Sequence, residues 1–105
     1  MTDMSDGPEV TENQAKSRFE VHIGAELAEL VYRKRADRLV LMHTGVPEEL
    51  GGRGLGGLLV QAALTKAAAE GLTIVPLCPF ARGWLQRHPD EAARATIDWG
   101  ERTDS

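Results

Sequence analysis

The sequence predicts a single α+β domain, a mostly antiparallel sheet with two main helices packed on it, and three observations support this expectation. In the first half of the chain, apolar and polar residues alternate with the period of two that is typical of half-buried strands, and later segments show the wider apolar spacing of helices. Between these regions, residues 50–59 read LGGRGLGGLL, a glycine cluster that leads straight into a helical stretch. A chain of 105 residues is long enough for one domain with a modest core.

Three strands are expected before the glycine cluster. Residues 19–23 and then residues 27–32 alternate apolar and polar side chains, and Gly24-Ala25 between them is suited to a hairpin turn. Residues 33–38 have the composition of a charged turn, and residues 39–44 form a more continuously apolar run that indicates a buried strand. Because only short turns separate these strands, we expect them to pair as antiparallel hairpins.

A helix, a strand and a second helix are expected after the cluster. Leucines and alanines recur at helical spacing from residue 53 or 54 to residue 70, and Gly71 is suited to cap the C-terminus of that helix. Residues 73–77 form an apolar strand in which Pro76 marks an edge or bulge position, and residues 79–86 form a helix with proline in its first turn. Because the last strand follows a full helical crossover, we expect it to pair in parallel with the third strand.

The folded domain is expected to span residues 16–99, and residues 90–99 to add a helical turn or a strand. Residues 1–15 are polar and acidic and can bury little surface, so we expect a disordered tail there. Residues 100–105 are expected to be a flexible C-terminus.

Composition excludes several classes of function. A formal net charge of -4 is unlike the basic character of a general nucleic-acid binder. The single cysteine, Cys78, allows neither an intramolecular disulfide nor a four-cysteine zinc site, and it suits a reducing compartment. No apolar run is long enough to span a bilayer, and the first residues lack the pattern of a secretion signal. We therefore expect a cytoplasmic protein that binds no metal, nucleic acid or membrane.

The glycine cluster allows three interpretations. Residues 52–57 fit the dinucleotide fingerprint G-x-G-x-x-G, but three strands precede them and the next strand ends without the acidic residue that the fingerprint requires. A surface turn without a ligand is the second, although Gly56 and Gly57 would each cost about 1 kcal/mol relative to alanine inside a helix. The third is a phosphate site, because glycines let the backbone approach an anion that also faces the N–H groups of a helix N-terminus. A Walker loop is excluded because no Gly-Lys-Ser/Thr triplet occurs.

The third interpretation matches more of the chain than the cluster alone. Residues 51–56 resemble the pyrophosphate loop of GNAT-type N-acetyltransferases, Gln/Arg-x-x-Gly-x-Gly/Ala, with Gly51 in place of the glutamine or arginine. Residues 19–89 resemble the short, single-domain members of that group. The further matches, in chain order, are His43-Thr44, Val46-Pro47, Leu59, Ala63, Cys78-Pro79-Phe80 and Arg87-His88-Pro89.

The resemblance implies a trimmed GNAT-like fold in which the parallel central pair of strands surrounds coenzyme A, delivered as acetyl-CoA. The pyrophosphate would lie on the N–H groups of the loop, with arginines neutralising its charge, and the pantetheine arm would pair with the backbone after the third strand. The cofactor-binding residues that follow are Thr44, Gly45, Val46, Gly51, Gly52, Arg53, Gly54, Leu55, Gly56, Gly57 and Arg82.

Two residues are candidates for catalysis of amine attack on the thioester. His43, near the end of the third strand, is the candidate base, although a strand histidine is often only a structural hydrogen-bonding group. Cys78 follows the last strand and is the candidate acid or nucleophile, although a lone buried cysteine is often an apolar filler. Tyr32, the only tyrosine, is expected to lie far away. Phe80 and Trp84 have helical spacing and are expected to be core residues first and a substrate wall second.

Two functions are therefore expected. The first is acetyl transfer from acetyl-CoA to an amine of a small molecule or protein, whose identity the sequence does not indicate. The second is a CoA-binding module with little or no catalysis, which the small size of the chain favours. The turn at Gly24-Ala25 stands where GNAT enzymes usually carry extra helices, so the acceptor side is expected to be open.

Overall fold

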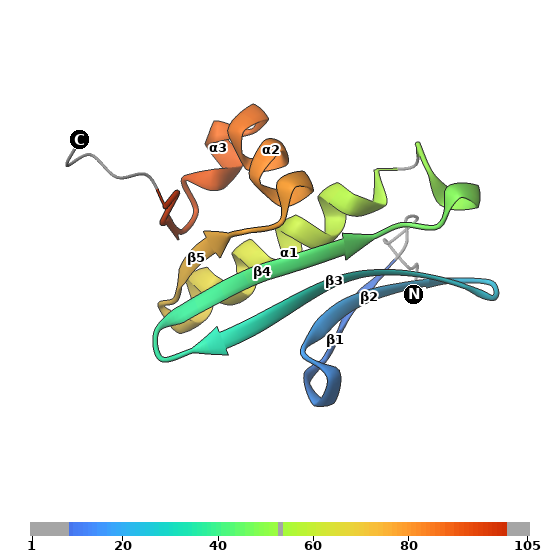
Figure 1. Ribbon diagram of the computed structural model, residues 1–105, viewed down its shortest axis with the longest axis horizontal. Helices are drawn as coiled ribbons and strands as arrows, with labels where there is room; N and C mark the ends of the chain where they lie inside the picture. Colours follow the sequence, from blue (N-terminus) through green and yellow to red (C-terminus); the bar gives the residue numbers. More distant parts are fainter. Residues whose placement is uncertain (1–8, 53, 101–105) are drawn as a thin grey trace, which may run out of the picture.

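The computed structural model describes residues 9–52 and 54–100, and within them one mixed sheet carries the helices (Figure 1). The strands, in their order across the sheet, are β1 (Val10–Asn13), β2 (Arg18–Ile23), β3 (Glu26–Arg35), β4 (Arg38–Gly45), β5 (Thr73–Pro76) and β6 (Thr96–Ile97). The helices are α1 (Leu55–Glu70), α2 (Pro79–Arg87) and α3 (Pro89–Ala92), and the 3-10 turns are η1 (Gln14–Lys16) and η2 (Glu48–Leu50).

The sheet has an antiparallel half and a parallel half. Strands β1 to β4 pair antiparallel with their neighbours, whereas β4–β5 and β5–β6 are parallel pairs. The parallel pairs are possible because α1 connects β4 to β5 and the α2–α3 segment connects β5 to β6. The predicted α+β class, with a mostly antiparallel sheet and a parallel central pair, is confirmed.

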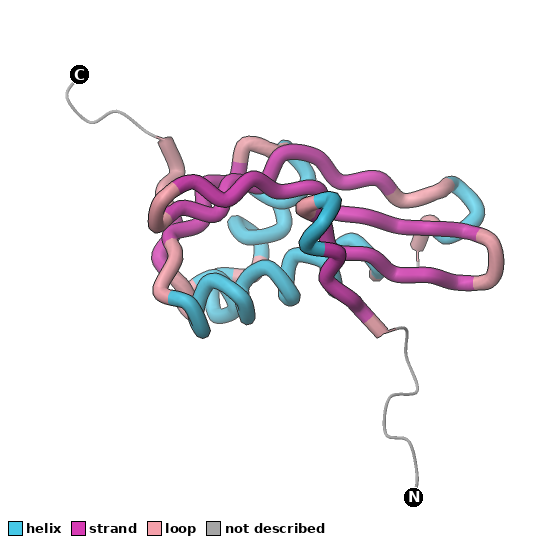
Figure 2. The backbone as a smooth tube through the Cα atoms, turned by 90° about the horizontal axis from the view of Figure 1, so that it is seen from below, coloured by secondary structure: helices cyan, strands magenta, loops and turns pink. Residues whose placement is uncertain are grey.

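The helices cover one face of the sheet, and no helix in the described part of the chain covers the other face (Figure 2). Alternate strand residues turn toward the helices, and α1 places its leucines and alanines on them. Each large aliphatic side chain buried in this way stabilises the fold by about 1.5–3 kcal/mol. The core residues of the strands are Phe19, Val21, Ala28, Leu30, Tyr32, Leu39, Leu41 and Ile74, and those of α1 are Leu55, Leu59, Val60, Ala63, Leu64 and Ala67.

The sequence-based elements from residue 18 onward agree closely with the structure. Gly24 turns β2 into β3 with a φ of +59°, and Gly71 caps α1 with a φ of +68° and donates its N–H to the carbonyl of Ala67. Pro79 begins α2 as expected. Pro76 pairs with Leu41 of β4, but β6 pairs only with Thr73 and Ile74 of β5. Pro76 therefore has no partner on the β6 side, and the N–H that proline lacks costs no hydrogen bond there. Residues 90–99 contain both of the expected alternatives, since most of α3 and all of β6 fall within them.

Two expectations were wrong. Residues 10–15 of the predicted disordered tail form β1 and begin η1, because every residue of β1 pairs with a residue of β2. Residues 33–38 were expected to form a charged turn, but β3 continues to Arg35 and β4 begins at Arg38. The turn consists of two residues, with Ala36 at a φ of +54°, and the charged side chains on either side of it are exposed at the end of the sheet. Residues 1–8 and 101–105 lie outside the described residues.

A partly buried polar contact attaches β1 to α1. The Tyr32 hydroxyl donates to the Glu12 carboxylate, and Lys66 of α1 donates to the same group over 3.0 Å. Burial, followed by the hydrogen bond to Glu12, raises the pKa of Tyr32 to about 12. Tyr32 is therefore a structural residue that helps to join β1 and β3 to α1.

A second polar group lies on the face without helices. The Glu20 carboxylate is 6% exposed and accepts hydrogen bonds from Asn13 (3.1 Å) and Arg18 (2.5 Å), and it contacts the His22 ring at 2.9 Å. These contacts, of which the one with His22 has the largest effect, lower the pKa of Glu20 to about 2. The contacts favour the ionised carboxylate and connect β1 to β2 on this face.

We expect the Glu20 contacts to make stability depend on pH between about 4.5 and 2. The pKa of Glu20 is below its usual value of 4.5, so the unfolded chain binds the proton more tightly. The stabilisation is complete above pH 4.5 and is lost as the pH falls toward 2. Glu20→Gln should lower the urea midpoint at pH 7, and its deficit relative to the native protein should shrink by pH 3. Glu26→Gln, which removes a carboxylate from the start of β3, is the control; a deficit for Glu20→Gln that does not change with pH would contradict this account.

Finally, no helix in residues 9–52 and 54–100 combines the length and apolar character needed to cross a membrane.

Candidate functional site

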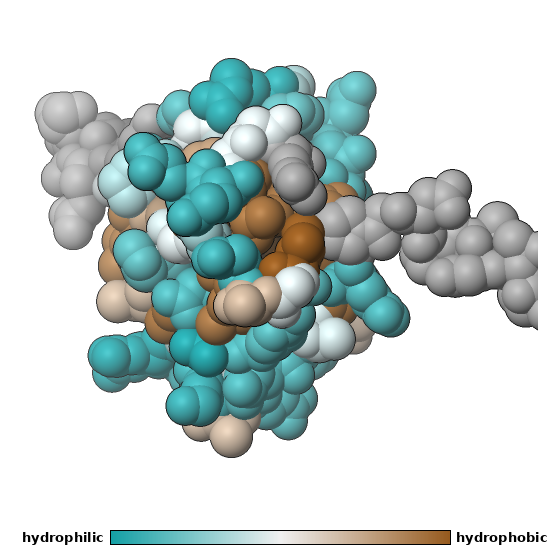
Figure 3. Space-filling model, turned by 90° about the vertical axis from the view of Figure 1, so that its right-hand side faces the viewer, coloured by the Kyte–Doolittle hydropathy of each residue, from teal (hydrophilic) through white to brown (hydrophobic). Residues whose placement is uncertain are grey.

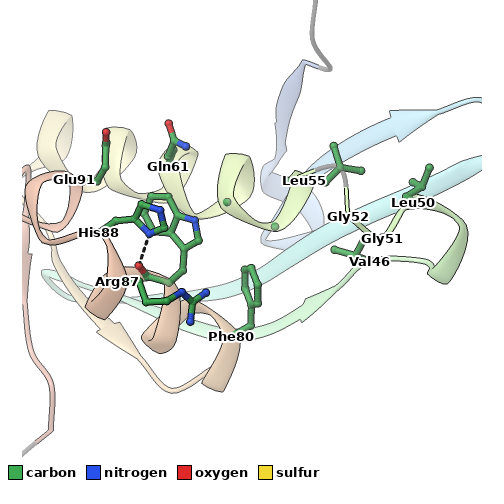
Figure 4. A pocket seen from close by; sticks show the side chains of 14 residues that line it. Val46, Leu50, Gly51, Gly52, Leu55, Gln61, Phe80, Arg87, His88 and Glu91 are labelled. Atoms are coloured by element: carbon green, nitrogen blue, oxygen red, sulfur yellow. Dashed lines mark hydrogen bonds between the residues drawn. The ribbon is translucent and has the colours of Figure 1, made fainter.

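A cavity of about 460 Å³ lies between the N-terminal half of α1, the face of α2 and the loop after β4 (Figure 4). Figure 3 looks at the end of the molecule that carries this loop, where hydrophobic residues come to the surface among hydrophilic ones. We call this cavity the α1–α2 groove. Its lining residues are Val46, Leu50, Gly51, Gly52, Gly54, Leu55, Gly56, Gly57, Gln61, Phe80, Trp84, Arg87, His88 and Glu91.

The glycine loop presents the N-terminus of α1 to the groove. Gly52 and Gly54 have φ angles of +83° and +73°, a region that glycine adopts without strain. A Cβ on either residue would meet nothing within 4 Å, so backbone conformation, and not lack of space, requires glycine there. Gly54 is the N-cap and makes no side-chain capping bond, so the first N–H groups of α1 have no partner from the cap. Together with the helix dipole, they provide an anion site. Arg53 lies outside the described residues.

Gly56 and Gly57 have a different role. A Cβ on Gly56 would lie 2.4 Å from Phe80 Cζ, and a Cβ on Gly57 would lie 2.6 Å from Trp84 Nε1. Both positions are therefore glycine because aromatic rings of α2 lie directly on the first turn of α1. Both glycines were predicted to admit a bound ligand, and the structure places the protein's own aromatic side chains against them.

Strands β4 and β5 separate at the middle of β4. Their last paired residues are Leu41 and Pro76, and the Leu41 carbonyl then accepts the N–H groups of both Leu77 (3.1 Å) and Cys78 (2.9 Å). The chain turns away into α2, whereas β4 continues to Gly45 beside β3. Residues 42–45 consequently have no strand on their other side among the described residues. Backbone groups along such an edge are able to pair with an extended ligand.

The separation brings two predicted site residues together. The Thr44 hydroxyl lies 3.1 Å from the Cys78 sulfur, across the gap between β4 and the start of α2. Cys78 is the N-cap residue of α2 and is only 3% exposed. Its thiol is thus held beside the open part of β4, although Cys78 is not among the residues that line the groove.

Two predicted residues lie elsewhere. His43 is exposed on the sheet face without helices, because its partner Val31 shares that face with Arg18. Arg82 donates to the Trp99 carbonyl over 2.8 Å and lies over the Trp99 ring, so it packs on the C-terminal segment and does not line the groove. The arginine of α2 that lines the groove is Arg87.

One face of α2 was only partly identified from the sequence. Phe80 is 41% exposed and Trp84 is 7% exposed, and both line the groove. Trp84 is thus a core residue as expected, whereas Phe80 is not. The His88 ring stacks on Trp84 with centroids 4.0 Å apart, and His88 Nδ1 lies 2.8 Å from the Trp84 carbonyl oxygen (Figure 4). Arg87 and His88 follow Phe80 by seven and eight residues in the sequence, which is two turns of a helix. Extending the Phe80–Trp84 spacing by one turn would have found them.

Comparison with known proteins agrees with this arrangement. The family model of GCN5-related N-acetyl-transferases matches residues 18–94. The solution NMR structure of a GCN5-like protein from Staphylococcus aureus, proposed to be an N-acetyltransferase, superimposes with a TM-score of 0.68. The two chains are 26% identical, and the match covers 92% of this chain and 96% of that one. The chain belongs to the GCN5-related N-acetyltransferase (GNAT) family, and it is an acyltransferase by this membership.

We expect Gly57→Ala to destabilise the protein. The added methyl group overlaps the buried Trp84 ring, and overpacking of this kind costs about 1–3 kcal/mol. Alanine is favoured over glycine in a helix by about 1 kcal/mol, so the net loss should be about 1 kcal/mol in urea unfolding. Gly83→Ala is the matched control: its methyl would meet only the far end of the Arg87 side chain at 3.2 Å, and it should be neutral or stabilising. Equal stability of Gly57→Ala and the native protein would show that Trp84 is not held in place.

Proposed function

We propose that this protein transfers the acetyl group of acetyl-CoA to an amine. The observation that carries the proposal is the open edge of β4, residues 42–45, which leads from the Thr44–Cys78 contact toward the glycine loop. An acyl-CoA has a pyrophosphate, an amide-rich arm and a thioester in that order. In the same order, the glycine loop offers an anion site and the open edge offers backbone groups for pairing. The Thr44–Cys78 contact then offers side chains that can take part in the reaction.

The loop and groove provide binding. The N–H groups at the start of α1 would hold the pyrophosphate, and Arg87 would add a charge-assisted hydrogen bond to a phosphate oxygen. The open edge would hold the pantetheine amides through the backbone of Thr44, Gly45 and Val46. This arrangement fixes the thioester near β4 and converts amine attack into a reaction between oriented groups.

In the reaction, a neutral amine nitrogen attacks the thioester carbonyl carbon. The C–N bond forms and the C–S bond breaks, the sulfur leaves with the bonding electron pair and takes up a proton, and the nitrogen loses one. His43 is the base for the amine proton, and the Cys78 thiol is the acid for the leaving sulfur. The two side chains lie on opposite faces of β4, so the base would reach the nitrogen and the acid would reach the sulfur from different sides of the strand.

Cys78 also has a second possible role as the nucleophile. Its sulfur would then take the acetyl group first, with release of the CoA thiol, and pass it to the amine in a second step. A CoA-binding module without turnover is the alternative function. Cys78 is only 3% exposed. If its thiol stays buried when the ligand binds, it cannot take part in the reaction, and this favours the CoA-binding module.

Acetyl-CoA binding tests the first part of the proposal. Calorimetric titration should show one binding event with acetyl-CoA and with CoA, and Arg87→Gln should weaken it about 10-fold because a charge-assisted hydrogen bond is lost. Arg94→Gln is the matched control, since Arg94 contacts Thr65 and Glu91 and does not line the groove. No binding to the native protein would refute the proposal, and equal weakening in both variants would refute the role of Arg87.

Release of free CoA thiol in the presence of a panel of amines tests the chemistry. Cys78→Ala should keep acetyl-CoA affinity and lose turnover by a factor of at least about 100, the usual contribution of a proton-transfer residue. Intact-mass measurement after incubation with acetyl-CoA separates the two roles of Cys78. If the native protein gains an acetyl group and Cys78→Ala does not, Cys78 is the nucleophile. If the native protein turns over and stays unmodified, Cys78 is the acid. Binding without turnover on any amine would support the CoA-binding module.

A further inference from the structure

On the open part of β4, Gly45 lies between the His43 imidazole and the Glu29 carboxylate of β3. His43 and Gly45 turn to the sheet face without helices, and their partners on β3 are Val31 and Glu29. A Cβ on Gly45 would lie 3.4 Å from His43 Nε2 and 3.7 Å from Glu29 Oε2. The absence of that Cβ leaves a small space with the His43 ring on one side and the Glu29 carboxylate on the other.

Neighbouring groups orient the carboxylate. Arg18 Nη1 donates to Glu29 Oε1 over 2.8 Å, and Glu29 Oε2 is the oxygen close to Gly45. Arg18 also donates to Glu20, so one guanidinium serves two carboxylates. The Glu29 side chain is 25% exposed and His43 is exposed, so a ligand can reach both from solvent.

The space is adjacent to the proposed site of chemistry. Thr44 stands between His43 and Gly45 in the sequence, and its side chain turns to the opposite face, where it contacts Cys78. Residues 42–45 have no β5 partner in the described structure, so no strand separates the two faces along this edge. A group bound over Gly45 would therefore lie across the β4 edge from a group bound beside Cys78.

We propose that Glu29 and His43 form the acceptor subsite, and that it selects a primary amine that arrives as an ammonium ion. This inference rests on the proposed acetyl transfer. Glu29 Oε2 accepts a hydrogen bond from the ammonium group, and its charge favours the cation over a neutral amine. His43 Nε2 takes one ammonium proton, and the freed lone pair forms the C–N bond as the C–S bond breaks. The departing sulfur takes up a proton from Cys78, and the nitrogen releases its second proton, which restores the Cys78 thiol. Glu29 is thus the specificity-determining residue, and His43 is the base.

The test compares a charged with an uncharged acceptor. Propylamine is an ammonium ion at pH 7.5, whereas aniline is neutral there. Glu29→Gln should raise the KM for propylamine about 10-fold, change the KM for aniline less than about 2-fold, and leave acetyl-CoA affinity unchanged. Glu26→Gln is the matched control: it removes the same charge from the same strand, but Glu26 lies on the other face and should preserve the preference for propylamine.

A second variant and a second readout do not depend on the Glu29 contacts with Arg18. Gly45→Ala fills the space at ordinary contact distance and keeps the backbone groups of β4, so it should raise the KM of propylamine while the protein stays folded. In two-dimensional NMR, propylamine should shift the backbone signals of His43 and Gly45 in the native protein, and aniline should not. A lysine-containing peptide and spermidine, tested in the same way, distinguish a protein acceptor from a small amine.

The results separate this inference from the proposed function. Native protein that binds acetyl-CoA and acetylates amines, but shows the same charge preference in Glu29→Gln and Glu26→Gln, overturns the acceptor subsite alone. Native protein that binds neither acetyl-CoA nor propylamine overturns both. Propylamine shifts at His43 and Gly45 without acetyl-CoA binding would support the amine subsite and refute acetyl transfer.

Discussion

The end of the β4–β5 pairing at Leu41 is the constraint on which the rest of the site depends. The Leu41 carbonyl accepts two successive N–H groups, from Leu77 and Cys78, and this ends the ladder while β4 continues along β3. One carbonyl thus sets the length of the open edge, the position of the Cys78 thiol beside Thr44, and the point at which the chain leaves the sheet to begin α2. Thr44 and Cys78, 34 residues apart in sequence, meet only because the two strands separate at this level.

The direction in which α2 leaves the sheet then shapes the groove. Its aromatic face packs on the first turn of α1, and Gly56 and Gly57 permit that approach because a Cβ on either would overlap a ring. The same glycine cluster therefore serves two purposes: Gly52 and Gly54 give the loop its left-handed backbone, and Gly56 and Gly57 admit Phe80 and Trp84. This division explains why the cluster contains more glycines than a turn or an anion loop needs by itself.

Much of the fold and of the candidate site could be predicted from the sequence. Local patterns identified β2, β3, β4, α1 and α2, and the resemblance identified the GNAT family that the comparisons confirm. The pattern failed at β1, whose exposed and acidic residues resemble a disordered tail because what stabilises them, pairing with β2 and the contact of Glu12 with Tyr32, is not local. The resemblance led to Arg82 as a phosphate-binding residue, whereas Arg87 lines the groove, because two arginines of one short helix cannot be assigned to faces until the helix is packed.

The sequence by itself determined the order of the elements from β2 to α2, the glycine loop at the start of α1 and the residue types available for chemistry, because alternation, helical spacing and backbone preference act over a few residues. Only the tertiary structure decided which of those residues meet. It placed Thr44 with Cys78 on one face of β4 and His43 with Glu29 on the other, because the β3–β4 register shifts at Met42, which has no partner on β3, and this shift reverses the faces of the residues that follow. Strand pairing, which depends on residues far apart in the chain, sets that register, and no local pattern contains it.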